Sequence, residues 1–208
     1  MPYRTTEKTR QKKDAKRTAM MTSAMRVFAE KGYHAATVRD VVSEADVAIG
    51  TFYFYFPDKE TLFVHLYEET ADFLLQAIEQ ALRTREGLAE QVNHAVQAYV
   101  NLAIYEPAIV QLLLVGGVGA VPSLSARRQA FRNRLVQIWE RPLSQAIQSQ
   151  SIPDQNTRRA AEAIAGAHDE VVLHLLNQAD PELEAALAVE ELTLFTLRAV
   201  AYSIQTRS

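Results

Sequence analysis

Glycine and proline are sparse in this sequence, and the apolar residues between them recur at the spacing of an α-helix. The 208 residues include seven Gly and seven Pro, which fall mostly between the periodic segments. The first of these segments, 14–31, repeats apolar residues at Met21, Met25 and Phe28, and Gly32 follows it as a stop signal. The pattern therefore predicts an all-α fold of about nine helices.

The remaining helices are predicted from the same periodicity and from their start and stop signals. Asp58 is expected to cap the fourth helix, and Pro107 and Pro181 occupy first helical positions. Pro142 lies inside a periodic segment and should kink or split it near 138–141. The predicted segments are 37–45, 49–55, 58–84, 88–105, 107–115, 123–149, 155–177 and 181–203. The buried stripe predicted for the fourth helix consists of Leu62, Leu66, Phe73 and Ala77.

The composition is that of an ordinary globular protein, with 48% hydrophobic and 23% charged residues. Cysteine is absent, which excludes a disulfide scaffold, a thiolate metal site and a catalytic cysteine, and which fits a reducing cytosol. The basic N-terminus is not followed by the apolar segment of a secretory signal, and the longest apolar run, 109–115, is too short to span a bilayer. We therefore expect a cytoplasmic protein that does not enter the membrane.

The charge of the chain is distributed unevenly. Residues 1–31 contain nine Lys or Arg and three Asp or Glu, whereas residues 61–208 contain eleven basic and seventeen acidic side chains. A basic head on an acidic body favours a polyanionic partner at one end of the molecule. The basic arm could follow a DNA backbone or minor groove, although a solvated tail fits the same charges. Its residues are Lys8, Arg10, Lys12, Lys13, Lys16 and Arg17.

Two short predicted helices, 37–45 and 49–55, are joined by a three-residue turn, 46–48. Thr37 and Asp40 have the spacing of a capping box. Two short helices that follow a long first helix form the pattern of a helix-turn-helix, although helical bundles also contain short helices.

The aromatic run 52–56 has a high β-propensity, but a strand there would have no partner because no other segment of the sequence resembles a strand. Phe52 and Phe56 instead stand four residues apart, which places both on one side of a helix. We expect them to anchor this helix against the first one.

The residues across the turn contain a specific string, Gly50-Thr51-Phe52-Tyr53, then Tyr55-Phe56-Pro57-Asp58-Lys59-Glu60. Together with the segments 28–33, 37–41 and 47–62, this string closely resembles the DNA-binding domain of the tetracycline-repressor (TetR) family. The match covers about residues 15–65, and the rest of the chain resembles the family only in length and helical layout. The resemblance implies a three-helix DNA-binding domain with a basic arm over residues 1–60. A larger helical domain for ligand binding and dimerisation would then occupy residues 61–208.

The resemblance also implies which residues contact operator DNA. A helix from Ala48 to Phe54 would face the major groove, while hydroxyl and ammonium groups hold phosphates. The implied contacts are Thr37, Arg39, Ala48, Ile49, Gly50, Thr51, Tyr53, Phe54, Tyr55 and Lys59. The sequence departs from the family at Asp46, where Gly is usual, and at Ala48 and Ile49, where polar residues are common. Asp tolerates the left-handed region, so the turn should survive, whereas Ala48 and Ile49 would read thymine methyl groups.

The larger domain contains a predicted dimer interface and a predicted effector pocket. The interface is implied for the last two helices, although the same apolar stripes fit an intramolecular core; its residues are Ile164, Val171, Leu175, Leu187, Leu194, Phe195 and Arg198. The pocket would suit an apolar or amphipathic effector such as a fatty-acyl or aromatic compound, although such a stripe also fits plain core. Its residues are Tyr99, Leu102, Ala103, Phe131, Leu135, Trp139 and His168.

The favoured function is a ligand-responsive transcriptional repressor that binds double-stranded operator DNA as a homodimer. An activator and a ligand-independent DNA-binding protein are alternatives. A helical metal enzyme is a more remote one, because the pairs Glu90/His94 and Glu170/His174 have i, i+4 rather than i, i+3 spacing. The segment 114–119 is glycine-rich but lacks the Lys-Ser/Thr of a phosphate-binding loop. We therefore expect no enzyme activity, no cofactor and no metal.

Overall fold

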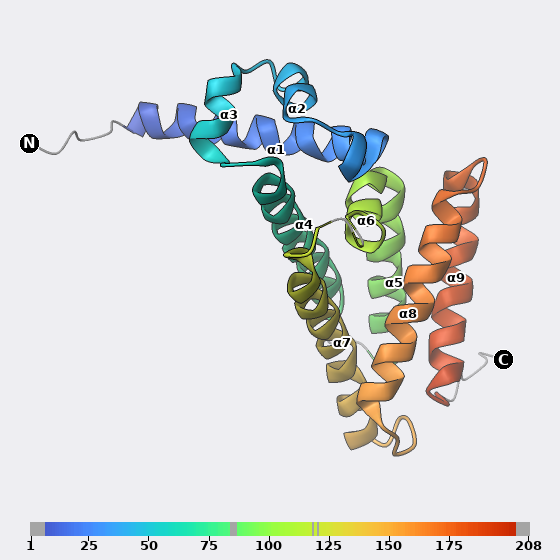
Figure 1. Cartoon of the computed structure of the whole chain (residues 1–208). Coiled ribbons are helices and arrows are strands. Elements are labelled where there is room, and N and C mark those ends of the chain that lie inside the picture. The colour runs from blue at the N-terminus through green and yellow to red at the C-terminus, as the bar shows by residue number, and fades with distance from the viewer. Residues whose placement is uncertain (1–6, 84–86, 118, 120, 203–208) are drawn as a thin grey trace, which may run out of the picture. The chain divides into compact units, whose positions relative to one another are not determined.

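The computed structural model describes residues 7–83, 87–117, 119 and 121–202, with side chains from residue 15 onward. Within these residues the chain forms nine α-helices and no strand, which confirms the all-α prediction (Figure 1). The helices are α1 (Glu7–Ala35), α2 (Val38–Glu44), α3 (Ile49–Tyr55), α4 (Lys59–Ala81), α5 (Leu88–Tyr105), α6 (Pro107–Leu114), α7 (Leu124–Gln148), α8 (Thr157–Leu176) and α9 (Pro181–Ala199). None of the described helices is long and apolar enough to cross a membrane.

The chain divides into two compact units. The first contains residues 1–69 and 111–125, and the second contains residues 70–110 and 126–208. The chain crosses between the units within α4, within α6 and near the start of α7. Our prediction that the DNA-binding domain ends at residue 60 stays a prediction, because compactness does not identify which residues bind DNA.

The core of the first unit is built around Phe63 of α4. Its ring lies edge-on to Phe28, with the ring centroids 4.8 Å apart, and 4.9 Å from the ring of Tyr33. Gly117 packs on the same ring with a φ of 66°, and a Cβ at this position would lie 2.6 Å from Phe63 Cε1. Glycine is therefore required at this position both by its backbone conformation and by its close approach to the ring.

The second unit is a bundle in which α5 packs against α8 and α9, and α8 packs against α9 (Figure 1). Trp139 of α7 is among the largest fully buried side chains. Two ion pairs connect α7 with the end of α4, namely Arg134 with Asp72 at 2.5 Å and Arg141 with Glu79 at 3.1 Å.

Two predictions about helix boundaries were wrong at α1. The helix begins at Glu7 rather than near residue 14, and it resumes after Gly32 to end at Ala35. Gly32 has φ 71° and ψ 165°, so it interrupts the helix as a kink instead of ending it. The short resumed segment is held by the packing of Tyr33 on Phe28 and Phe63, a long-range contact that the periodicity does not contain.

The predicted stripe of α4 was wrong at Phe73, whose surface is 51% exposed. The large buried residues in this half of the helix are Leu74, Leu75 and Ile78, which have i, i+1 and i+4 spacing. The side that these residues bury leaves the Phe73 ring on the exposed side of the helix.

Pro142 does not split α7, which is continuous from Leu124 to Gln148. Trp139 and Leu143, on either side of the proline, are both buried. The packing of these side chains offsets the backbone hydrogen bond that proline removes.

Candidate nucleic-acid interface

The start of α2 is fixed by a capping box, as the sequence predicted. Thr37 Oγ1 accepts a hydrogen bond from the Asp40 amide at 3.1 Å, and Asp40 Oδ2 accepts one from the Thr37 amide at 2.8 Å. Lys31 Nζ donates to Asp40 Oδ1 at 2.7 Å. These bonds from Lys31 and then Thr37 lower the pKa of Asp40 to about 2. The carboxylate is therefore ionised at neutral pH and holds the N-terminus of α2 to the end of α1.

The turn between α2 and α3 uses the left-handed conformation that the sequence analysis allowed for Asp46. Its φ is 50°. Two backbone hydrogen bonds flank this residue. The Ala45 amide donates to the Val41 carbonyl at 2.9 Å, and the Val47 amide donates to the Val42 carbonyl at 3.0 Å. Asp thus replaces the usual glycine without breaking the turn, because its short polar side chain tolerates positive φ.

Helix α3 has one buried side and one exposed side. Phe52 and Phe56 are fully buried, with ring centroids 5.7 Å apart, which confirms that they share one buried side. On the other side Tyr53 is 55% exposed and Phe54 is 65% exposed, and Ile49 at the helix N-terminus is exposed as well. A seven-residue helix in the first unit therefore presents three large apolar or aromatic side chains to solvent.

The residues predicted to contact DNA lie on α2 and α3, at the N-caps of these two helices and at the start of α4. Thr37, Arg39, Ala48, Ile49, Gly50, Tyr53 and Phe54 are exposed, while Thr51, Tyr55 and Lys59 are half-buried. Arg39 forms no salt bridge with any residue that the structure describes. At Gly50 an added Cβ would meet nothing within 4 Å, so the packing of the protein itself does not require glycine there.

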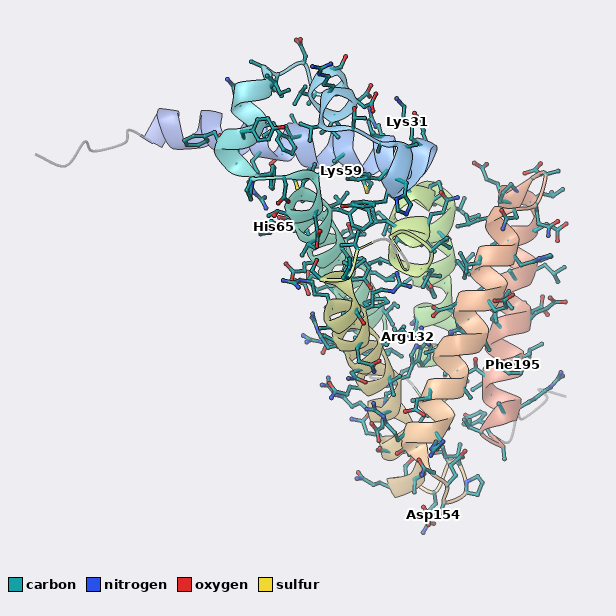
Figure 2. The ribbon with its side chains drawn as sticks, in the orientation of Figure 1. Lys31, Lys59, His65, Arg132, Asp154 and Phe195 are labelled. Atoms are coloured by element: carbon teal, nitrogen blue, oxygen red, sulfur yellow. The ribbon has the colours of Figure 1, made fainter. Side chains whose placement is uncertain are left out.

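Lys59 has a structural role that the sequence analysis missed. Its ammonium donates to the carbonyl oxygens of Tyr33 at 2.7 Å and Ala36 at 2.8 Å, and it lies 4.3 Å from the centroid of the Tyr33 ring (Figure 2 labels Lys59). In the sequence, only Gly32 pointed to this contact, because the carbonyl groups that follow an interrupted helix need hydrogen-bond donors from elsewhere. Lys59 therefore connects the start of α4 to the end of α1, and a phosphate contact by Lys59 stays a prediction.

The basic arm lies largely outside the described side chains, which begin at residue 15. The side chains of Lys8, Arg10, Lys12 and Lys13 belong to the undescribed part. Lys16 is exposed. Arg17, in contrast, pairs with Glu69 at 2.6 Å and lies 5.9 Å from the centroid of the Phe56 ring. Arg17 thus has partners within the first unit.

The residues predicted to line an effector pocket gather in the interior of the second unit. Tyr99, Ala103, Phe131, Leu135, Trp139 and His168 are buried, and Leu102 is half-buried. The rings of Trp139 and His168 are arranged edge to face, with centroids 5.0 Å apart. Whether these side chains contact an effector stays a prediction.

A salt bridge that was not predicted from the sequence lies beside these residues and joins Arg132 to Asp169. Tyr99 Oη donates to Asp169 Oδ1 at 2.8 Å, and Arg132 Nη1 donates to Asp169 Oδ2 (Figure 2 labels Arg132). Burial raises the pKa of Asp169, while the charge of Arg132 and the two hydrogen bonds partly offset this effect. Arg132 is thus already neutralised by a carboxylate of the protein itself.

The predicted dimer residues fall into two groups. Ile164 and Leu175 are buried within the protomer and belong to its intramolecular core, which is the alternative that the sequence left open. Val171, Leu187 and Phe195 are exposed. An open hollow on α9 is lined by seven residues, Leu187, Glu190, Glu191, Leu194, Phe195, Arg198 and Ala199 (Figure 2 labels Phe195).

The sequence profile of the family described as "Bacterial regulatory proteins, tetR family" matches residues 21–66, which include α2, α3 and the start of α4. The chain is 27% identical to the fatty acid metabolism regulator protein of Bacillus subtilis over 72% of this chain and 78% of that protein. It is 25% identical to the HTH-type transcriptional activator FasR of Mycolicibacterium smegmatis, over 55% of this chain and 52% of that protein. The match thus spans only about half the length of FasR.

Solved structures with this fold cover nearly the whole chain. A tetR-family regulatory protein from Rhodococcus RHA1 has a TM-score of 0.75 and 23% identity, and the match covers 91% of this chain and 98% of that one. The regulator FadR from Bacillus subtilis, solved in complex with stearoyl-CoA, has a TM-score of 0.74 and 22% identity, with 85% and 97% covered. At this level of identity the similarity shows a shared fold.

Proposed function

Because this chain belongs to the TetR family of bacterial regulatory proteins, we propose that it is a ligand-responsive transcriptional repressor that binds a palindromic operator as a homodimer. Residues 1–60 bind the DNA, and residues 61–208 bind the effector and form the dimer. Two-fold symmetry places the two copies of α3, the recognition helices that enter the major groove, about one turn of DNA apart.

The observation that carries this proposal is the exposed side of α3. Large apolar side chains on a short surface helix are costly unless a partner covers them. The major groove offers such a partner, because thymine methyl groups can cover Ile49 and Phe54 while the Tyr53 hydroxyl donates to a phosphate. Arg39, exposed on α2, can form a bidentate pair with a guanine edge.

The effector is a fatty-acyl or aromatic compound that enters the buried group around Tyr99, Trp139 and His168. The support for a fatty-acyl compound is that the Bacillus subtilis FadR of similar fold was solved with stearoyl-CoA. Helix α4 belongs to both units, so a ligand-induced shift of this helix would change the separation of the recognition helices. A coupling free energy of about 1–3 kcal/mol is enough to change operator affinity by up to roughly two orders of magnitude.

The DNA-binding role is tested by a Tyr53→Ala variant. Genomic fragments retained by the purified wild-type protein are sequenced, and the enriched duplex is used in binding titrations. We expect an inverted repeat, and we expect Tyr53→Ala to bind it about tenfold more weakly because a phosphate contact and exposed aromatic surface are lost. Tyr105→Ala is the control, since Tyr105 is also exposed but lies on α5. Equal affinity of all three proteins for the enriched duplex, or no enrichment, would contradict the proposal.

The dimer is tested by Phe195→Asp. A carboxylate on this exposed part of α9 would be buried beside its symmetry mate in the dimer, so we expect the dimer dissociation constant to rise at least about 30-fold. Phe73→Asp is the matched control, because Phe73 is a similarly exposed phenylalanine on α4. Sedimentation velocity at micromolar concentration should show a monomer for Phe195→Asp and a dimer for Phe73→Asp. A dimer in both cases would place the interface elsewhere.

A further inference from the structure

His168 of α8 is buried and carries a ring nitrogen without a partner. Only 1% of its surface is exposed, and its Nε2 lies 2.8 Å from Thr196 Oγ1 of α9. The other nitrogen, Nδ1, is buried and has no hydrogen-bond partner among the described residues. Buried polar side-chain atoms almost always have a partner, so an unpaired one needs a specific explanation.

The hydrogen bond to Thr196 indicates which nitrogen carries the proton. The Thr196 hydroxyl is fully buried, and His168 Nε2 is the only partner that the described part of the structure gives it. If the hydroxyl donates to Nε2, its proton and the lone pair of Nε2 are both satisfied, and Nδ1 carries the hydrogen. The reverse arrangement would leave the hydroxyl proton and the Nδ1 lone pair unpaired together. The ring therefore presents an unpaired N–H donor at Nδ1.

The charge around the ring indicates what this donor can bind. Burial lowers the pKa of His168 to about 4, so the ring is neutral at physiological pH. On the neighbouring residue, the carboxylate of Asp169 is already balanced by Arg132. The carboxylate of a free fatty acid bound here would have no counter-ion, because His168 is neutral and Arg132 already pairs with Asp169. Burying an unpaired charge is much more costly than burying a neutral carbonyl.

We propose that His168 Nδ1–H donates a hydrogen bond to an uncharged carbonyl oxygen of the effector, as in an acyl thioester, and that the site thereby selects a thioester over a free fatty acid. This inference rests on the proposed function and deepens it, because it assigns one polar contact and the chemical class of the group that receives it. Trp139, the single tryptophan of the chain, lies against the His168 ring, so its fluorescence reports on binding.

The test uses three probes of equal chain length: stearoyl-CoA, its thioether analogue S-octadecyl-CoA, which lacks the carbonyl, and stearate. Titrations follow Trp139 fluorescence and release of the enriched operator duplex. For the wild type we expect stearoyl-CoA to bind about tenfold more tightly than S-octadecyl-CoA, and stearate to bind most weakly. In His168→Leu the thioester and the thioether should bind within about threefold of each other. His168→Gln retains an N–H donor and should restore part of the preference.

A second measurement does not depend on the folding of a variant. In wild-type protein labelled with ¹⁵N-histidine, we expect a neutral Nδ1–H ring, whose Nδ1 proton moves downfield with stearoyl-CoA and not with S-octadecyl-CoA. If stearoyl-CoA releases the operator equally well from the wild type and from His168→Leu, and the Nδ1 proton does not move, this inference is overturned while the regulator stands. If no probe binds a wild type that recognises its operator, the acyl effector of the proposed function and this inference both fail.

Discussion

A Phe52→Ala variant is expected to lose about 3–5 kcal/mol of the free energy of unfolding of the first unit. Phe52 is fully buried and is the only residue of α3 in the hydrophobic core. The centroid of its ring lies 5.7 Å from that of Phe56. Its truncation leaves a cavity under a seven-residue helix that has little intrinsic stability. Operator binding should therefore be lost at temperatures where the wild type still binds.

Phe54→Ala is the matched control, because Phe54 lies two residues further along the same helix but is 65% exposed. We expect its stability to stay within about 0.5 kcal/mol of the wild type, while its operator affinity falls. Urea unfolding can separate the two units, since far-UV circular dichroism reports on all helices and Trp139 fluorescence reports on the second unit. An early transition in circular dichroism alone is expected for Phe52→Ala. Equal stability of both variants would contradict the assignment of the two sides of α3.

Replacing Arg132 by methionine is expected to destabilise the second unit by about 2–3 kcal/mol at pH 7. The change leaves the buried Asp169 carboxylate without its counter-ion, and the loss of one partner from a buried pair is strongly destabilising. The expected loss is smaller than the roughly 3–5 kcal/mol that is usual for a fully buried pair, because the Arg132 side chain is 37% exposed and partly solvated. Urea unfolding followed by Trp139 fluorescence measures the effect.

The loss in Arg132→Met should depend on pH. Burial raises the pKa of Asp169 in the folded protein, and removal of the Arg132 charge raises it further. A carboxyl group whose pKa is higher in the folded state stabilises the protein below its unfolded pKa of about 4, and this stabilisation disappears as pH rises through the folded pKa. The difference in the free energy of unfolding between Arg132→Met and the wild type should therefore shrink as the pH falls from 7 to 4.5.

Arg134→Met provides the comparison for this experiment. Arg134 also forms a salt bridge from α7, with Asp72 of α4, but both side chains are more than half exposed. We expect it to lose less than about 1 kcal/mol, with little change between the two pH values. A loss in Arg132→Met as small as that in Arg134→Met would show that the Asp169 pair is effectively solvated.

The parts of the interface that could be predicted depend on neighbours within a few residues. The capping box joins residues three apart, Asp46 adopts its left-handed conformation within a single turn, and Phe52 and Phe56 share a side because they are four apart. The periodicity also located the two helices of the helix-turn-helix. The outward direction of Phe73 could not be predicted, because several apolar residues of α4 competed for one buried side.

By itself, the sequence determined the helical class and the helix-turn-helix, because each of these rests on local hydrogen bonds and on side-chain spacing along one helix. Only the tertiary structure decided that Lys59 binds carbonyl oxygens 23 and 26 residues away. It also decided that Arg132 is neutralised by Asp169 and that His168 Nδ1 is left unpaired. The physical reason is that a polar group acquires its partners from whichever distant helices pack against it, and the periodicity of one helix carries no information about these neighbours.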